Sequence, residues 1–349
     1  MRHLVAALAR IPSVDLSVWA PPGELPEGAT YIVSPVDARW LARLMALGGI
    51  SHMMRSGGWR SWFAPLRLMR MMGAGYRARP DADIYHVNWL QCALPLPNNS
   101  KPALVTVLGN DLKLLKLPFM RYLMRRAMKR RKVVICPNAD WMSGPLQAAF
   151  GDVAEIRPVS FGIDPCWYAI KRDYDEDQPH RWLAVTRLTA DKLGPLFDWS
   201  NKIFRDKRRE LHLFGPMQED IEVPEWVHYH GPITPEQLAN EWFPKACGLI
   251  TLSRHAEGRP QVMLEAMAAG LPIIASDMPA HASIVFDGET GKLCDSMESY
   301  VAALDNVEDV PTNHRLGVAA RSWASREIGT WDDCAARYAQ IYSHLLGAT

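Results

Sequence analysis

Short apolar runs alternate along this chain with segments that are long enough to form helices. In the first half the runs cover residues 14–19, 84–87, 103–107 and 133–136. In the second half they cover residues 182–186, 211–214, 227–229, 249–252 and 271–275. Strands separated by helix-length segments are typical of parallel sheets built from βαβ units. The alternation therefore predicts an α/β protein with two Rossmann-like series of strands.

A polar stretch separates the two series. Residues 171–180 read KRDYDEDQPH, and a charged segment of this kind with a proline near its end predicts a linker. A chain of 349 residues also exceeds the size at which one hydrophobic core usually keeps growing. We therefore expect an N-terminal domain over residues 1–168, a linker over 169–180 and a C-terminal domain over 181–330.

The two halves carry opposite net charge. Residues 1–165 hold 21 Lys and Arg against 11 Asp and Glu, whereas residues 166–349 hold 18 against 27. Six cysteines stand singly without a CxxC pair, which indicates a reducing cytoplasm rather than a disulfide framework. No apolar run reaches the length of about 20 residues that crosses a bilayer, and no signal peptide is recognised at the start. A cytoplasmic protein is expected.

The segment at residues 253–291 places two glutamates around an expected helix start. Glu257 and Glu265 are eight residues apart, and Gly258 and Pro260 suit the beginning of a helix. The free N–H groups at such a start can bind phosphate, and Glu265, two turns further on, can accept hydrogen bonds from sugar hydroxyls. Taken alone, the two glutamates could equally be solvated helix residues.

The run that follows Glu265, AMAAGLP at residues 266–272, distinguishes these readings. Two glutamates at this spacing followed by Ala-Met-Ala-x-Gly-x-Pro resemble the signature of the retaining GT-B glycosyltransferases of family 4, the glycosyl transferases group 1. The resemblance implies an α/β fold of GT-B type, with two Rossmann-like domains facing a central cleft. It implies that Glu265 binds the donor ribose, that Glu257 lies near the transferred sugar, and that the backbone at Gly258, Arg259 and Pro260 approaches that sugar and the diphosphate.

A second element, VTRLTADK at residues 185–192, resembles the family's Gly-Arg-Leu-x4-Lys pattern after the first strand of the C-terminal domain. The resemblance implies that Arg187 and Lys192 face the diphosphate and act with Glu257 in catalysis. Fixed cations stabilise the negative charge that develops on a departing nucleoside diphosphate without a metal. The alternative is two exposed basic residues in a loop. Gly215, in a strand-end turn, is assigned to the donor site.

The ends of the chain are interpreted by the same comparison. Residues 331–349 resemble the family's final helix, which crosses back to the N-terminal domain. Residues 2–10 already look like the helix that follows the family's first strand, so that strand is expected to be missing, through an upstream start or a shortened chain.

The acceptor side of the cleft also departs from the family pattern. Leu108 stands where many relatives have histidine, and leucine cannot donate a hydrogen bond. Gly109, Asn110 and Asp111 remain as candidates that line the acceptor side. Asp164 is expected to form a turn together with a neighbouring glycine.

Two basic segments predict contact with an anionic membrane surface. Residues 113–132 hold nine basic and no acidic side chains, with Leu, Met, Phe and Tyr at near-helical spacing. Residues 53–79 add six arginines together with tryptophan and phenylalanine. Such segments suit an interfacial helix on the inner face of the cell membrane, although their apolar faces could instead belong to the core. A nucleic-acid partner is not predicted, because no recognised nucleic-acid module accompanies them.

The sequence thus predicts a metal-independent, retaining hexosyltransferase that moves a hexose from a nucleoside-diphosphate sugar to a glycan or lipid-linked acceptor. Synthesis of polysaccharide or cell envelope is the expected setting. No cofactor is predicted besides the donor substrate, and the Asp-x-Asp pairs at residues 81–83 and 173–175 are not assigned to a metal because converging partners are missing. The competing hypothesis is a non-catalytic or truncated GT-B protein that binds or scaffolds, suggested by Leu108 and the missing first strand.

Overall fold

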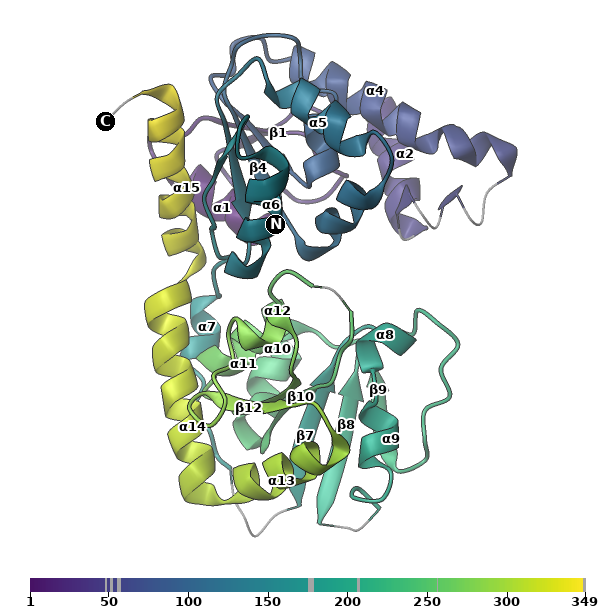
Figure 1. Ribbon diagram of the computed structural model, residues 1–349, viewed down its shortest axis with the longest axis vertical. Coiled ribbons are helices and arrows are strands. Elements are labelled where there is room, and N and C mark those ends of the chain that lie inside the picture. Colours follow the sequence, from purple (N-terminus) through teal and green to yellow (C-terminus); the bar gives the residue numbers. More distant parts are fainter. Residues whose placement is uncertain are drawn as a thin grey trace. The chain divides into compact units, whose positions relative to one another are not determined.

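The computed structural model describes residues 1–47, 49–50, 53–54, 58–174, 179–205, 208–255 and 257–347. Part of the expected linker and residues 55–57 of the basic segment 53–79 lie outside this description. The chain divides into two compact units (Figure 1). Unit 1 comprises Met1–Ser160 and Trp331–Thr349, and unit 2 comprises Phe161–Thr330.

Unit 2 is built on a six-stranded parallel sheet in the order β12-β11-β10-β7-β8-β9. Its strands are β7 (His180–Val185), β8 (Arg209–Phe214), β9 (Val227–Gly231), β10 (Gly248–Thr251), β11 (Ile273–Ser276) and β12 (Gly291–Cys294). The order reverses between β7 and β10. This is the doubly wound arrangement, in which ligands bind beyond the carboxyl ends of the strands at the reversal.

Helices cover both faces of this sheet. They are α7 (Pro165–Tyr168), α8 (Ala190–Leu193), α9 (Leu196–Ser200), α10 (Pro235–Gln237), α11 (Gln261–Ala268), α12 (Pro279–Ala282), α13 (Met297–Glu308) and α14 (Val310–Trp323). Neighbouring residues of β7 enter different cores, Leu183 packing in one and Trp182 in the other, because successive side chains of a strand point to opposite faces. Both faces are therefore buried, which explains the nearly continuous apolar runs of the sequence.

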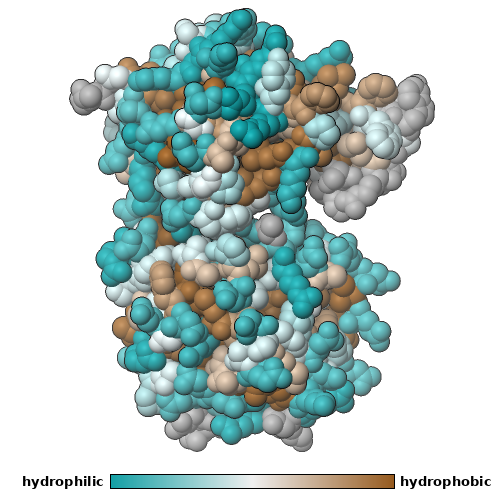
Figure 2. All heavy atoms as spheres, viewed as in Figure 1, coloured by the Kyte–Doolittle hydropathy of each residue, from teal (hydrophilic) through white to brown (hydrophobic). Residues whose placement is uncertain are grey.

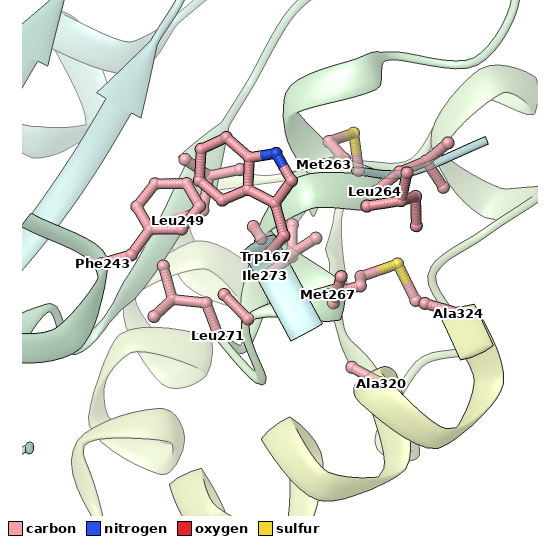
Figure 3. Packing of buried hydrophobic residues seen from close by; sticks show 14 of the residues in the cluster. Trp167, Phe243, Leu249, Met263, Leu264, Met267, Leu271, Ile273, Ala320 and Ala324 are labelled. Atoms are coloured by element: carbon pink, nitrogen blue, oxygen red, sulfur yellow. The ribbon is translucent and has the colours of Figure 1, made fainter. Parts of the chain in front are cut away.

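The core that contains Leu183 explains why α7 belongs to unit 2, which begins at Phe161. Trp167, on α7, is 2% exposed and packs against Phe243, with ring centroids 5.0 Å apart. Met263 and Leu264 of α11 belong to the same cluster (Figure 3). Burial of large apolar side chains such as these contributes about 1.5–3 kcal/mol each, so α7 is part of the unit 2 core.

Unit 1 contains a four-stranded parallel sheet in the sequential order β3-β4-β5-β6. Its strands are β3 (Tyr85–Asn88), β4 (Ala103–Val107), β5 (Val133–Pro137) and β6 (Glu155–Ile156). A separate parallel pair is formed by β1 (Leu16–Val18) and β2 (Ala29–Tyr31). The helices of this unit are α1 (Arg2–Ala9), α2 (Pro35–Ala46), α4 (Ala64–Arg77), α5 (Met120–Met128), α6 (Ser143–Phe150) and α15 (Trp331–Leu346).

The last helix, α15, is joined to the unit 1 sheet by a chain of buried polar side chains. His86 Nδ1 lies 2.6 Å from Tyr342 Oη, and His86 Nε2 lies 2.9 Å from Thr106 Oγ1. Thr106 Oγ1 in turn lies 3.1 Å from Tyr338 Oη. Burial lowers the pKa of His86 to about 4, so the imidazole is neutral at physiological pH. These bonds satisfy polar groups that would otherwise be buried without partners.

Hydrophobic and hydrophilic side chains are interspersed on the face of the molecule shown in Figure 2. Among the described residues, no helix combines the length and the apolar character needed to cross a membrane.

Candidate functional site

The candidate site lies at the carboxyl edge of the unit 2 sheet, where the strand order reverses. Arg187 and Lys192 follow the end of β7, and Glu257 follows the end of β10. Because β7 and β10 are neighbours in the sheet and run parallel, the segments that leave them meet at one edge.

Lys192 and Glu257 form an ion pair in which Lys192 Nζ donates to Glu257 Oε1. The two side chains are only 12% and 19% exposed, respectively. Lys192 is held by α8, whose first turn is capped by Thr189: its Oγ1 accepts a hydrogen bond of 3.3 Å from the Lys192 N–H. Two charges that the sequence analysis assigned to the donor thus compensate each other in the protein without a ligand.

The loops after β7 and β10 are bound to each other through their backbones. The Arg254 N–H donates to the Asp191 carbonyl at 2.8 Å, and Ser253 Oγ donates to the same oxygen at 3.4 Å. Gly194 ends α8 with a φ of +56°, and a Cβ there would lie 2.0 Å from the Leu252 carbonyl oxygen. Only glycine allows this approach, so the Lys192–Glu257 pair rests on a rigid support.

A third loop, after β11, completes the edge. Ser276 Oγ donates to the Ser253 carbonyl at 2.7 Å. His281, fully buried on α12, places Nδ1 3.0 Å from the Ser276 carbonyl oxygen. Since a carbonyl only accepts, Nδ1 carries the hydrogen and Nε2 is left as an acceptor; it has no hydrogen-bond partner among the described residues. Burial lowers the pKa of His281, which keeps the ring neutral.

Glu265 lies in the second turn of α11 and is close to a second carboxylate. Burial, and after it the negative charge of Asp164, raise the pKa of Glu265 to about 7. Gln261, one turn earlier on α11, donates from Nε2 to the Gly162 carbonyl at 2.9 Å. Carboxylate oxygens accept hydrogen bonds, and a protonated carboxyl group also donates one, so this part of the site can bind hydroxyl groups.

The residues between Glu257 and α11 are buried. Gly258, Arg259 and Pro260 lead into the first turn of α11, and Arg259 is 9% exposed. Within the described part of the chain no side chain caps this helix start. Its N–H groups and the positive end of the helix dipole are the kind of site that binds phosphate.

Two other predicted donor residues have different surroundings. Arg187 is exposed, and its Nη1 lies 3.4 Å from Gln218 Oε1 rather than beside the ion pair. Gly215 has a φ of +137°, and a Cβ there would lie 1.7 Å from the Thr186 carbonyl oxygen. The structure therefore shows a backbone requirement at Gly215, where the chain leaves β8 against the end of β7.

The predicted acceptor residues Gly109, Asn110 and Asp111 belong to unit 1. They begin the 3₁₀ helix Gly109–Lys116, directly after β4. Asp111 is 3% exposed, and its Oδ2 accepts a 2.8 Å hydrogen bond from the Leu108 N–H. Burial raises the pKa of Asp111 to about 6. The Asp111 carboxylate thus stabilises the turn in which it lies.

The two Asp-x-Asp pairs, at residues 81–83 and 173–175, are only partly described by the structure. Asp81 is bound by Arg79 at 2.9 Å, and Asp175 lies outside the described residues. In the part of the chain that is described, no group of three or more His, Cys, Asp or Glu side chains is placed to hold a metal ion.

Sequence reasoning did not identify three of these residues as site residues: Ser276, His281 and the neighbour of Glu265, Asp164. Asp164 was expected only to shape a turn; its side chain also caps α7 by accepting from the Cys166 N–H at 3.0 Å. The sequence could have indicated Ser276 and His281 only through their positions at and after the end of β11, which neighbours β10. Loops at that edge of the sheet converge.

Known proteins resemble the part of the chain that contains this site. Residues 182–309 match the family model described as Glycosyl transferases group 1. The D-inositol 3-phosphate glycosyltransferase of Streptomyces scabiei is 32% identical over 124 residues, 35% of this chain and 27% of that protein. The enzyme of the same name from Corynebacterium diphtheriae is 30% identical over 119 residues, 33% of this chain and 27% of that protein. The chain spans about a quarter of the length of these curated relatives.

Solved structures resemble the whole chain. The sucrose-phosphate synthase of Thermosynechococcus elongatus has a TM-score of 0.71 at 17% identity, covering 100% of this chain and 93% of that one. Anabaena HepE in complex with UDP has a TM-score of 0.65 at 13% identity, covering 79% and 82%. These likenesses confirm the predicted α/β fold, with two parallel sheets as in GT-B glycosyltransferases.

Proposed function

We propose that this chain, whose residues 182–309 match the family model described as Glycosyl transferases group 1, transfers a hexose from a nucleoside-diphosphate sugar, with retention of the anomeric configuration, to a glycan or lipid-linked acceptor. The observation that carries the proposal is the Lys192–Glu257 pair at the reversal of strand order in unit 2. Ligands of doubly wound sheets bind at this position.

In the proposed mechanism Lys192 exchanges partners when the donor binds. Its Nζ leaves Glu257 and binds the diphosphate, whose negative charge grows as the glycosidic bond breaks. Because α8 holds Lys192 in place, no further movement of the protein is needed as that charge develops. Glu257 is then free to accept hydrogen bonds from the transferred sugar, and the N–H groups at the start of α11 bind the phosphate beside it. Arg187, which is exposed, reaches the diphosphate from the solvent side.

We assign the ribose to Glu265 and Asp164. A furanose presents two neighbouring hydroxyls, and a carboxyl pair can satisfy both with short hydrogen bonds. The raised pKa of Glu265 fits this role, because a hydroxyl that donates to the carboxylate compensates for burying its charge.

UDP and UDP-glucose are the first donors to test, because HepE is described in complex with UDP and with UDP-glucose. The acceptor side belongs to unit 1, with Gly109, Asn110 and Asp111 as the proposed lining. Contact of residues 53–79 and 113–132 with an anionic membrane, at the cytoplasmic face, would bring the enzyme to a lipid-linked acceptor in cell-envelope or polysaccharide synthesis.

The experiment compares ligand binding with turnover. Thermal unfolding is followed with UDP, GDP and ADP and their glucose conjugates, with and without Mg²⁺, for the natural chain, Lys192→Ala and the control Lys202→Ala. Lys202 is an exposed lysine of the same unit. A ligand that binds the folded state raises its stability. We expect one diphosphate to stabilise the natural chain and the control, and to bind Lys192→Ala about tenfold to a hundredfold more weakly, as expected for a lost charged hydrogen bond.

Release of nucleoside diphosphate from the matching nucleotide sugar is then measured. Binding without any turnover on a range of acceptors would favour the competing function, a GT-B binding or scaffold protein. Equal binding and turnover in the natural chain and Lys192→Ala would reject the proposed site.

A further inference from the structure

Helix α5 exposes an apolar tip on unit 1. Its buried side is formed by Met124 and Met128, whereas Tyr122 is 61% exposed and Leu123 is 45% exposed. Just before the helix, Phe119 is 80% exposed. Single exposed apolar residues are ordinary, but neighbouring ones at a helix start form a contiguous surface that marks an interaction site.

Phe119 is also held in an unusual backbone conformation. Its φ is +60° and its ψ is −11°, the left-handed region that residues with a Cβ avoid. Its carbonyl nevertheless accepts the hydrogen bond of 2.9 Å from the Leu123 N–H, so the residue belongs to the helix start. Strained conformations of this kind concentrate at functional positions. The strain here holds a phenyl ring outward into solvent.

A basic groove lies beside the tip. Its volume is about 1260 Å³, which is larger than the roughly 300–1,000 Å³ usual for a small-molecule site. Its lining includes Tyr122, Leu123, Arg125, Arg126, Lys129 and Arg130. Tyr122 and Leu123 of the tip thus line the same groove as the cations, and Phe119 directly precedes the helix that carries them.

Most of the positive charge in this groove is uncompensated. Arg125 is paired with Asp152, the one acidic residue among the described residues of the lining. Arg130 donates to the amide oxygen of Asn98 at 2.7 Å, which leaves its charge unpaired. Arg126 and Lys129 are exposed, and neither side chain forms an ion pair or a hydrogen bond with a residue that the structure describes. The groove is therefore ready to bind an anion.

We propose that this groove binds the phosphate of an anionic phospholipid headgroup while Phe119, Tyr122 and Leu123 insert into the interfacial region of the bilayer. Basic residues near an anionic surface and apolar residues inserted beside them act together in peripheral binding. A nucleic acid would satisfy the cations and could stack a base on Phe119. It offers no apolar phase for the aliphatic Leu123, whereas a lipid surface accounts for the cations and for all three apolar side chains. The inference deepens the membrane contact of the proposed function and rests on it.

The test is sedimentation with vesicles of phosphatidylcholine alone or mixed with phosphatidylglycerol. We expect binding to the mixed vesicles only, weakened about thirtyfold in the double variant Arg126→Ala/Lys129→Ala, since each cation contributes about fivefold. The control Lys202→Ala, in unit 2, should bind as the natural chain does. Addition of inorganic phosphate at the vesicles' phosphate concentration should not displace the protein if the lipid surface is the ligand.

Phe119→Gly separates insertion from a structural role. Glycine adopts a positive φ freely, so this change should raise the melting temperature of unit 1 while weakening vesicle binding several-fold. A phenylalanine that served only the fold would show the reverse: lower stability and unchanged binding. Failure of the natural chain to bind mixed vesicles, or equal binding by the double variant, would overturn the inference. Nucleotide stabilisation of unit 2 reports on the donor site separately and should persist in all these variants.

Discussion

Replacing Glu265 by glutamine should make the protein more stable at alkaline pH and less able to bind its donor. Burial, with the added effect of Asp164, raises the pKa of Glu265 from 4.5 to about 7. Between these two values the folded chain holds a proton that the unfolded chain has lost, so the free energy of unfolding falls as pH rises. The contribution is absent below pH 4.5 and complete above pH 7.

The magnitude follows from the difference in pKa. The rise from 4.5 to about 7, at about 1.4 kcal/mol per pKa unit, corresponds to about 3.5 kcal/mol of lost stability above pH 7. An amide of the same size cannot ionise, so Glu265→Gln should be more stable than the natural chain by up to about 3.5 kcal/mol at pH 8 and by only about 1 kcal/mol at pH 5. Donor binding should weaken because the amide nitrogen cannot accept a hydrogen bond from a hydroxyl.

The assay is urea unfolding at pH 5, 6, 7 and 8 for the natural chain, Glu265→Gln and Glu222→Gln, an exposed glutamate of the same unit. The difference between Glu265→Gln and the natural chain is compared across pH, because other groups that titrate cancel in it. The reasoning would be refuted if this difference did not change with pH, or if the variant were the less stable protein at pH 8. The control should show no trend of this size.

Two further substitutions test the structure of unit 2, one beside the site and one at the amino ends of the strands. Gly215→Ala should lower the free energy of unfolding by about 1–3 kcal/mol or prevent folding, since its Cβ would lie 1.7 Å from a carbonyl oxygen; Gly231→Ala, at a φ of +72° with no atom within 4 Å, should cost less, as urea unfolding will show. Glu308→Ala should cost about 3–5 kcal/mol by the same measurement, because it leaves Arg209, which donates to Glu308 at 2.6 and 2.7 Å, partly buried without that partner.

The alternation of apolar runs predicted the central strands of both sheets, because strands buried on two faces are continuously apolar. The edge strands β3 and β9 were predicted as well, but three other short edge strands were not. Strand β2 (Ala29–Tyr31), β6 (Glu155–Ile156) and β12 (Gly291–Cys294) have two to four residues and few apolar side chains, so nothing in their local sequence distinguishes them from loops. The run at residues 14–19 does contain β1, but β1 pairs only with β2 and stays outside the four-stranded sheet.

Two short motifs predicted the residues proposed for the donor site. Glu257, Glu265 and Lys192 were identified from spacing and resemblance, and their roles remain proposals. The ion pair between Lys192 and Glu257 joins residues 65 positions apart, and the approach of Asp164 to Glu265 spans a still longer separation. Local patterns do not encode such distances, because they depend on which strands become neighbours in the sheet.

By itself the sequence determined the α/β class, the presence of two strand series and the motif around Glu257 and Glu265, since each depends on residues close together along the chain. Only the tertiary structure decided that the strand order reverses between β7 and β10, that Ser276 and His281 join the same edge, and that α15 is tied to the unit 1 sheet through His86. It also decided the raised pKa of Glu265. Burial and charge proximity arise from segments brought together by folding, and they set the chemistry of a side chain whose type alone the sequence specifies.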